Sequence, residues 1–543
     1  MVARRSWQTI VAAALVAATV GLSACTPGDG EGADTDQKSS TEHFGYLVDT
    51  QLVTTNAGTV VGASSNTEAL SGRLYPAVFV PGPSGQMIPN SDMVQTQVLP
   101  GVHRKVIYTL SDNAQYSDGT QMTCTDFLLY VVAGQNPDLF GSHLPLTKQV
   151  SNIECEPGVK RFTVEFGDDG GGRWRHLFGP GSVMPAHAIA RKAGMSVNDL
   201  HGALRNRDVA ALQEPARIWR DGFSLQEFDP ELQVSSGPFV VERVGADGEA
   251  ILGVNPHYYG DSPRQDSLVV WPHTADPAQL AEVGALRIAD IRSENPTWVN
   301  RDDPTNKFII EAQAGDLTDT LMLGELGIFQ QRTSRAAFAA CVDQAAVAGA
   351  SSEVSGIEVP PVLLRTVMHH DPVTAQMQDI TDRQAGVDIP KASVLAGYTI
   401  RIGYPGPDER KAAMVQAIAR SCEPAGITVV DASAEGSTMA DMPRRETSEW
   451  GGQFITEGTV DAVLSAVDPL AEYGTVSARA PEIDGLRAAE DYLWEEVPTI
   501  PLSAQPRRFV IDRTVGNVVV YTGLAGIGWN MDRWHVSEDG NAR

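Results

Sequence analysis

The sequence predicts a mixed α/β protein, and three features support that prediction: a strand–helix–strand unit, a hairpin and a packing helix. Residues 398–404 alternate as a strand does, residues 408–424 have helical spacing, and residues 426–430 form a second apolar run. A strand–helix–strand unit of this kind predicts two parallel strands joined by a right-handed crossover. The other two features are a hairpin within residues 234–261 and an amphipathic packing helix over residues 335–343.

Local signals place further boundaries. Asp247-Gly248 lies between two short β-rich runs and supplies the positive φ angles that a tight hairpin turn needs. A helix is predicted to begin directly after Thr123, which can cap it, with Asp126 in the first turn where the helix dipole favours an anion. Residues 196–221 are predicted to be helical and polar, with a break near Pro215.

The N-terminus has the features of an export signal. Arg4-Arg5 precedes an apolar stretch over residues 9–24, which is shorter than the roughly 20 apolar residues of a membrane span. The small residues before Cys25 (Leu22-Ser23-Ala24) form a lipobox. Residues 1–24 are therefore predicted to be a lipoprotein signal peptide, with Cys25 lipidated. The alternative is a plain secretory signal with an incidental cysteine.

Composition limits the class of protein. Residues 25–43 are predicted to form a disordered tether behind the lipid, because small and polar residues dominate them. The hydrophobic content of 42% over 543 residues allows sizeable cores. The net charge is −27, and no Lys/Arg-rich run follows the signal, so nucleic-acid binding is not expected.

The cysteine count predicts disulfides. Of five cysteines, four remain if Cys25 is lipidated: Cys124, Cys155, Cys341 and Cys422. An even number in an exported protein suggests two disulfides, for which three pairings exist. The alternative is four buried free thiols.

Five segments share a family resemblance, and they follow one another in the family's order. Their sequences are YSDGTQMTCTDF (116–127), VSSGPFVVERVGADGEAILGVNPHYYGD (234–261), RAAFAACVD (335–343), VDAVLSAVDP (460–469) and VPTIPL (497–502). They resemble segments of the peptide/nickel class of solute-binding proteins, which serve ABC importers. The resemblance covers most of residues 44–543.

The resemblance implies a fold of two lobes joined by crossing strands, with a hinge between the lobes and an extra subdomain in the larger one. The larger lobe is expected to combine residues 44–295 with 500–543, and the smaller lobe to span residues 296–499. This division favours the pairings Cys124–Cys155 and Cys341–Cys422, since each then stays within one lobe.

The resemblance also implies ligand contacts, with one departure. Peptide-binding members use an aspartate after a tryptophan to pair with the ligand's α-amino group. This chain lacks that tryptophan, and Ser465 stands about where the aspartate would be, so Asp468 is a possible substitute. The candidate ligand-binding residues are thus Asn56, Ser236, Asp461, Ser465 and Asp468, with a turn-forming role as the alternative for Asn56.

The function implied is that of a solute-binding protein on the extracytoplasmic face of the cell membrane, held there by its lipid. Its partners would be a peptide or similar small solute and an ABC permease. We expect a monomer, no enzyme activity, no cofactor and no metal. Two alternatives stay open: a non-transporting relative that acts in cell-envelope lipoglycan assembly or regulation, and an envelope enzyme with a catalytic set assembled from distant segments.

Overall fold

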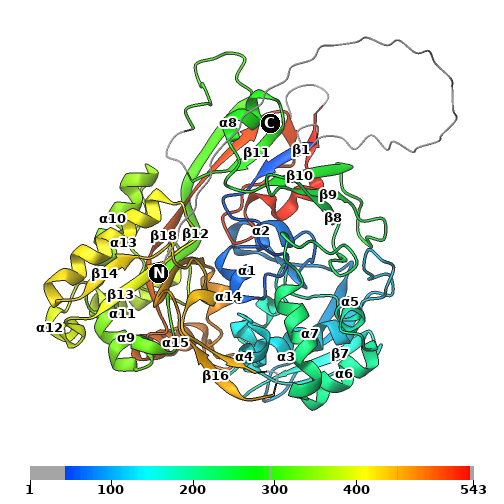
Figure 1. Ribbon diagram of the computed structural model, residues 1–543, viewed down its shortest axis with the longest axis horizontal. Helices are drawn as coiled ribbons and strands as arrows, with labels where there is room; N and C mark the ends of the chain where they lie inside the picture. The colour runs from blue at the N-terminus through cyan, green and yellow to red at the C-terminus, as the bar shows by residue number, and fades with distance from the viewer. Residues whose placement is uncertain (1–42, 293–295, 449, 538–543) are drawn as a thin grey trace, which may run out of the picture. The chain divides into compact units, whose positions relative to one another are not determined.

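The computed structural model describes residues 43–292, 296–448 and 450–537 (Figure 1). The predicted signal peptide, the lipidation site Cys25 and all of the tether except His43 lie outside the described residues. Among the helices of the described part, none combines the length and the apolar character that crossing a bilayer requires.

A ten-stranded mixed sheet runs through the protein. From one edge to the other its strands are β14 (Thr428–Asp431), β13 (Thr399–Gly403), β17 (Ala462–Val467), β12 (Phe308–Leu323), β18 (Thr499–Asp512), β11 (Leu286–Asp290), β1 (Phe44–Leu47), β10 (Ser267–Trp271), β9 (Ala250–Val254) and β8 (Phe239–Val244).

Two long strands join the halves of this sheet. β12 and β18 pair antiparallel from Phe308 opposite Asp512 to Met322 opposite Thr499. The C-terminal end of β18 also pairs with β11, and the C-terminal end of β12 also pairs with β17. Because β12 and β18 are antiparallel, these two neighbours lie at opposite ends of the pair. Each of the two strands therefore belongs to both halves, as crossing strands of a two-lobed protein do (Figure 1).

The strand–helix–strand prediction is confirmed. β13 and β14 pair in parallel, and α13 (Glu409–Cys422) connects them. The hairpin prediction is confirmed as well, because β8 and β9 pair antiparallel and Gly248 of the turn has φ of +80°. α9 (Arg332–Ala339) supplies the predicted packing helix, although it begins and ends earlier than the predicted range.

A second, four-stranded sheet has the order β4 (Val94–Leu99), β5 (Lys105–Leu110), β7 (Arg161–Phe166) and β6 (Val150–Glu154). The helices in the same part of the chain are α1 (Val60–Ser64), α2 (Glu68–Ser71), α3 (Cys124–Gln135), α4 (Pro137–Phe140), α5 (Ala186–Lys192), α6 (Val197–Asn206), α7 (Val209–Asp221) and α8 (Pro277–Glu282). Helices α3 to α7 gather at the lower right of Figure 1.

The remaining helices are α10 (Gln344–Ser355), α11 (Gln378–Gln384), α12 (Ile389–Ala392), α14 (Pro469–Glu472) and α15 (Glu482–Glu496). Three two-stranded sheets complete the strands: β2 (Phe79–Pro81) with β3 (Met87–Pro89), β15 (Arg444–Thr447) with β16 (Gln453–Thr456), and β19 (Val515–Gly516) with β20 (His535–Val536).

Capping decides two helix boundaries. α3 begins where predicted, with Thr123 and Asp126 forming a reciprocal capping box.

The predicted break near Pro215 is wrong, because α7 continues through that proline. The chain breaks instead at Arg207, which has φ of +51°, and Asp208 then caps α7. Apolar residues of α7 are buried around the proline, and this burial offsets the roughly 3 kcal/mol that an interior proline costs.

The buried apolar side chains form separate clusters, and the two largest include residues from opposite ends of β18. The largest cluster draws mainly on residues 44–288 and 509–534, and a second one on residues 321–502. Two hydrophobic cores of this kind fit two lobes that each bury their own apolar surface.

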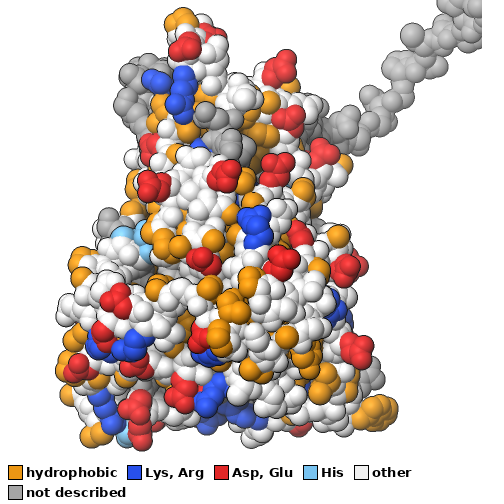
Figure 2. All heavy atoms as spheres, turned by 90° about the vertical axis from the view of Figure 1, so that its left-hand side faces the viewer, with side chains coloured by type: hydrophobic (Ala, Val, Ile, Leu, Met, Phe, Trp, Pro, Cys, Tyr) orange, Lys and Arg blue, Asp and Glu red, His pale blue; other side chains and the backbone are white. Residues whose placement is uncertain are grey.

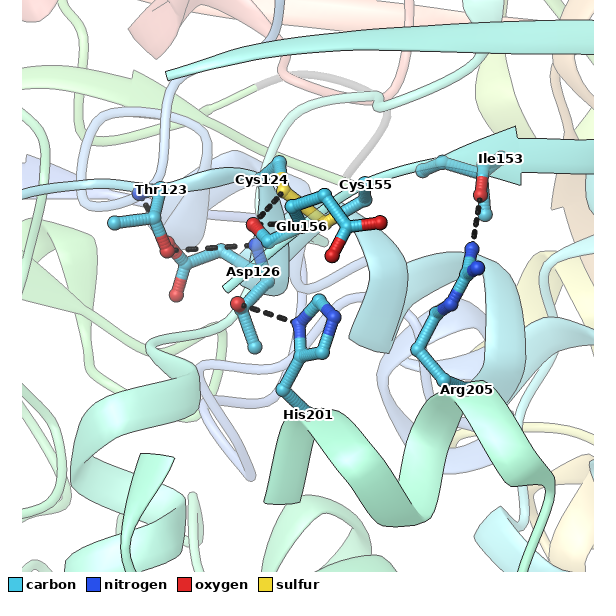
Figure 3. Close-up of a disulfide and its surroundings, with 9 residues drawn as sticks. Thr123, Cys124, Asp126, Ile153, Cys155, Glu156, His201 and Arg205 are labelled. Atoms are coloured by element: carbon cyan, nitrogen blue, oxygen red, sulfur yellow. Dashed lines mark hydrogen bonds between the residues drawn. A yellow bond between two sulfur atoms is a disulfide. The ribbon is translucent and has the colours of Figure 1, made fainter. Parts of the chain in front are cut away.

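Both disulfides have the pairing favoured from the sequence: Cys124–Cys155 and Cys341–Cys422. Figure 3 shows the first, which links the start of α3 to the chain just after β6. Beside it, Arg205 of α6 donates to the carbonyl oxygen of Ile153 at 3.1 Å. The bridge therefore ties a sheet edge to the helices that cover it.

Figure 2 shows the face that lies on the left in Figure 1, which carries α10, α12 and α13. Acidic and basic side chains are interspersed over this face.

Candidate functional site

A cavity of about 110 Å³ lies between two distant parts of the chain. One wall comes from residues 57–68 (including α1 and the start of α2), Tyr130, residues 143–146 and residues 176–182. The other wall comes from Met439 and residues 465–472, at the end of β17 and along α14. The cavity thus lies where the two halves of the molecule meet.

Contacts around the cavity hold its walls together. His143 Nε2 lies 2.8 Å from Glu472 Oε2, and both side chains line the cavity. The backbone N–H of Met439 donates to Ser64 Oγ at 2.9 Å. These interactions define a closed state, and separating the walls would break them.

The cavity is acidic. Glu68 from α2 and Asp468 at the N-terminus of α14 line opposite walls. Burial, together with the charge of Asp468, raises the pKa of Glu68 to about 8. Burial likewise raises the pKa of Asp468, although backbone N–H groups and the nearby charge of Arg173 oppose this rise. Two carboxylates that share one enclosed space disfavour each other's ionised form.

The two histidines of the cavity differ in charge. Burial lowers the pKa of His143, but the adjacent Glu472 carboxylate outweighs burial, so the pKa is raised overall. His176 has no such partner, and burial together with Arg173 and Arg175 lowers its pKa to about 3. His176 is therefore neutral at physiological pH.

Two acceptor-bearing groups at the cavity have no hydrogen-bond partner. Ser465 is 5% exposed, and its Oγ is buried without a partner in the described part of the chain. Asn66 Oδ1 is also a buried atom without a hydrogen-bond partner in the described part of the chain. Buried polar atoms without partners are uncommon in folded proteins, and a bound ligand or water is a usual reason for them.

The structure brings together two of the five predicted ligand-binding residues. Ser465 and Asp468 both line the cavity. Asn56, Ser236 and Asp461 are not among the residues that line it.

Each of those three has a place in the framework. The side chain of Asn56 donates to Trp219 O at 2.7 Å and accepts from Gly58 N at 3.0 Å, which is the turn-forming role. The Asp461 carboxylate accepts two hydrogen bonds from the Arg401 guanidinium and one from the backbone N–H of Arg401. Ser236 is buried in the turn before β8.

Sequence reasoning missed Glu68, His143, His176 and Glu472. Glu68 lies in the first turn of a short helix, where a glutamate is ordinary because the helix dipole favours it. The histidines follow no recognisable spacing. Their common location depends on how distant segments pack, and local pattern does not reveal that.

A second, smaller cavity of about 40 Å³ lies beside the crossing strands, and charged side chains dominate its lining. Two buried ion pairs adjoin it: Arg410 with Asp319 of β12, and Arg507 of β18 with Asp290 of β11. Burial lowers the pKa of Lys411, also in the lining, to about 8. These charges anchor α13 and β11 to the two strands that join the halves.

Within the described residues, no group of three or more His, Cys, Asp or Glu side chains could hold a metal ion. The polar groups of the main cavity come from both halves of the molecule. They line a space that the two halves enclose and that lies apart from both disulfides.

Comparison with known proteins agrees with this geometry. No protein-family profile matches the chain. An uncharacterized lipoprotein of Mycobacterium tuberculosis is 29% identical over 571 aligned positions, covering 96% of each chain.

Two solved structures resemble the described fold. The periplasmic EDTA-binding protein EppA superposes with a TM-score of 0.62 at 16% identity, over 91% of this chain and 96% of its own. The oligopeptide-binding protein AppA of Bacillus subtilis, in complex with a nonapeptide, superposes with a TM-score of 0.58 at 12% identity. The match covers 91% of this chain and 100% of AppA. The chain therefore has the two-lobed fold of periplasmic solute-binding proteins, with one large sheet passing through both lobes.

Proposed function

We propose that this protein is a lipid-anchored, extracytoplasmic solute-binding protein of an ABC importer. Its larger lobe comprises residues 44–295 and 500–543, and its smaller lobe residues 296–499. The lobes close on a peptide or a similar small solute, and the protein delivers it to a membrane permease. It acts by binding and release, without an enzymatic step.

The observation that supports this proposal is the cavity between the lobes. Both lobes contribute to its lining, so a solute held there contacts both. A solute can stabilise closure only through contacts that the open state lacks. Ser465, with its buried and unpartnered Oγ, offers such a contact.

The volume of the cavity bears on the size of the solute. A cavity of about 150 Å³ holds a benzene molecule, and the cavity here is about 110 Å³. A solute held wholly within this volume is therefore small, of the order of one amino acid side chain. An extended peptide would need a wider separation of the lobes.

The N-terminal sequence supports the location. The lipobox before Cys25 fits a protein that is exported and then acylated, and the mycobacterial relative is itself named a lipoprotein. A lipid and a tether rich in polar residues raise the local concentration of the protein at a membrane permease without a permanent interface.

Native mass spectrometry of the intact, acylated protein tests the proposal. We expect a bound small solute after gentle purification, and we expect it to be lost in the Ser465→Leu variant, whose side chain fills the cavity. Ser151→Leu, at an exposed position on β6, is the matched control and should keep the solute. Wild-type protein that never carries a solute would contradict the proposal.

The small volume of the cavity also favours a second candidate, a non-transporting relative that works in envelope assembly. In that case the closed state described would be permanent, with the His143–Glu472 contact as part of a fixed interface. Protein that stays free of solute and shows no change in melting temperature with any solute would support this candidate.

A further inference from the structure

The second cavity lies on the opposite face of the central sheet from the main one. On β12, Met322 lines the main cavity, whereas Asp319 pairs with Arg410, which lines the second. Side chains three positions apart on a strand point to opposite faces of the sheet. In Figure 1, α10 and α13 accordingly lie to the left of β12 and β18, and α1 and α14 to the right. The second cavity is therefore separate from the proposed solute site.

The volume of the second cavity suits a small occupant. It is about 40 Å³, and one water molecule needs about 10–15 Å³. Residues 49 and 290–292 of the proposed larger lobe contribute to the lining, as do residues 355–357 and 408–411 of the smaller one. An occupant of a few atoms would thus contact both lobes where the crossing strands join them.

Positive charge is in excess around this cavity. Two of the lining charges are paired with residues outside the lining, Arg410 with Asp319 and Asp290 with Arg507. These two partners add one charge of each sign, so the balance is set by the lining itself. The lining has four basic side chains, Arg292, Arg410, Lys411 and Arg508, and three acidic ones, Asp49, Asp290 and Asp408.

Lys411 carries the positive charge that its surroundings balance least. Its side chain is buried, and in the described part of the chain it forms no ion pair and a single long hydrogen bond, of 3.4 Å, to the carbonyl oxygen of Leu464. An ammonium group has three N–H donors, so two of them are unused. Burial lowers the pKa of Lys411, and the charge of Asp408 opposes this only in part. A buried charge without a partner is costly, and a bound counter-ion would remove that cost.

Two more side chains of the lining have unused hydrogen-bonding groups. Arg292 Nη1 lies 3.5 Å from Asp408 Oδ2, yet it is buried without a hydrogen-bond partner among the described residues. Gln505 of β18 is 8% exposed, and its Oε1 is likewise buried and unpartnered. Because that oxygen accepts no hydrogen bond from a described residue, the amide can turn and present its N–H donors to the cavity.

We infer that the second cavity binds a small monovalent anion, held by the Lys411 ammonium, the Arg292 guanidinium and the Gln505 amide. Chloride and formate both have the required charge and size. Lys411 belongs to the proposed smaller lobe and Arg292 to the larger one, so the anion ties the lobes together beside the crossing strands. Charge-assisted hydrogen bonds from both cations hold it. The inference does not depend on the proposed function, because the anion binds without a solute.

Other occupants fit the lining less well. A cation would add to the excess of positive charge, and the described residues contain no group of three or more His, Cys, Asp or Glu side chains that could hold a metal ion. Water molecules fit the volume, but they leave the charge of Lys411 without a counter-ion. An anion supplies both the hydrogen-bond acceptors and the missing charge.

Binding of the anion should depend on pH. The anion favours the protonated ammonium, so its affinity is full below the pKa of Lys411, which is about 8, and falls as the pH rises through that value. Burial raises the pKa of Asp290, and ionisation of this carboxyl with rising pH weakens anion binding further. The other charged groups around Lys411 are Asp408 and Arg410 on α13, Arg292 after β11, Asp319 on β12, Asp49 after β1, and Arg507 and Arg508 on β18.

Thermal unfolding of the intact, acylated protein in a non-ionic detergent, without added solute, tests the inference. Sodium chloride or sodium formate replaces sodium gluconate at constant ionic strength, because gluconate is too large for the cavity. At pH 7 we expect each small anion to raise the melting temperature by about 2 °C, in a saturable manner, and by less at pH 9.

Lys411→Met should abolish this rise. The variant should still fold, because an apolar side chain of similar length replaces a buried charge that has no partner. Lys391→Met, at an exposed position on α12, is the matched control and should keep the rise. Broadening of the chloride NMR signal measures binding directly, and we expect it with the wild type and Lys391→Met but not with Lys411→Met.

Each outcome decides between an anion and water. Stabilisation by only one of the two anions would support the site and identify its ligand. No rise with either anion in the wild type, or an equal rise in Lys411→Met, would overturn the inference and leave water as the occupant. Neither result bears on solute capture in the main cavity, which native mass spectrometry tests separately.

Discussion

His143 and Glu472 contribute a pH-dependent contact between the lobes. The raised pKa of His143 makes the pair an ion pair at low pH. Because the pKa of His143 is raised on folding, the ion pair contributes its full stabilisation below pH 6.5, the pKa of the histidine in the unfolded chain. This contribution is lost as the pH rises through the pKa of His143 in the folded state. The contact should therefore weaken as the pH rises through that raised pKa, which lies above 6.5.

Replacing Glu472 with Gln tests this contact. We expect a loss of about 1 kcal/mol in the free energy of unfolding at pH 6 and a smaller loss at pH 9, measured by urea denaturation. Asp168→Asn removes a similar but exposed contact to His103 and is the control, with little expected effect at either pH. An equal loss for Glu472→Gln at both pH values would contradict the ionic account.

At the scale of residues, the predicted ligand-binding residues that lie at the cavity are two of those that a family motif marks. Ser465 and Asp468 were identified because the segment 460–469 resembles a family motif, and both line the cavity. Asp461 lies in the same motif, yet its carboxylate is occupied by Arg401. Glu68 has no motif around it, and its unusual pKa arises from burial and from a residue 400 positions away.

At the scale of elements, the two disulfides stabilise different cores. Cys341–Cys422 joins the chain after α9 to the end of α13, with a sequence separation of 81 residues. Cys124–Cys155 has a separation of 31 residues and ties α3 to the four-stranded sheet. Both link residues within one hydrophobic cluster, so each should act on its own lobe.

The double variant Cys341→Ala/Cys422→Ala should lose about 4–5 kcal/mol on the chain-entropy model, and Cys124→Ala/Cys155→Ala about 3–4 kcal/mol. Because the cores are separate, we expect each variant to show two calorimetric transitions, with the lobe that lost its bridge unfolding first. A single transition shifted as a whole would show instead that the lobes unfold as one unit.

Elements with local signals were predicted well from the sequence. The capped start of α3, the β8–β9 hairpin and the β13–α13–β14 unit each depend on residues close together in the chain. The break between α6 and α7 was misplaced, since the capping aspartate at position 208 outweighed the proline. The full length of β12 and β18 was not predicted, because strands that cross both lobes are specified by partners far away in sequence.

At the scale of the whole molecule, β12 and β18 determine how the lobes can move. Their pairing is interrupted between Ala314 and Thr318, where the register shifts. On either side of this interruption the strands are firmly paired to one lobe or the other. Bending of the molecule is therefore expected at this irregular segment, which contains Gly315.

A side chain at position 315 should oppose the closed state. A Cβ there would lie 2.7 Å from Arg507 Cγ and 3.0 Å from the carbonyl oxygen of Gln505. In Gly315→Val the strands must separate, and the solute-lining residues stay unchanged. We expect affinity for the natural solute to fall about tenfold or more, since less of the protein reaches the closed state.

Small-angle scattering measures the same effect directly. With its solute, the wild type should have a smaller radius of gyration than Gly315→Val under the same conditions. Gly349→Ala is the control, because that glycine lies within α10 and a Cβ there meets nothing within 4 Å. If Gly315→Val closes as fully as the wild type, the bend lies elsewhere along the crossing strands, and the register shift is only a local irregularity.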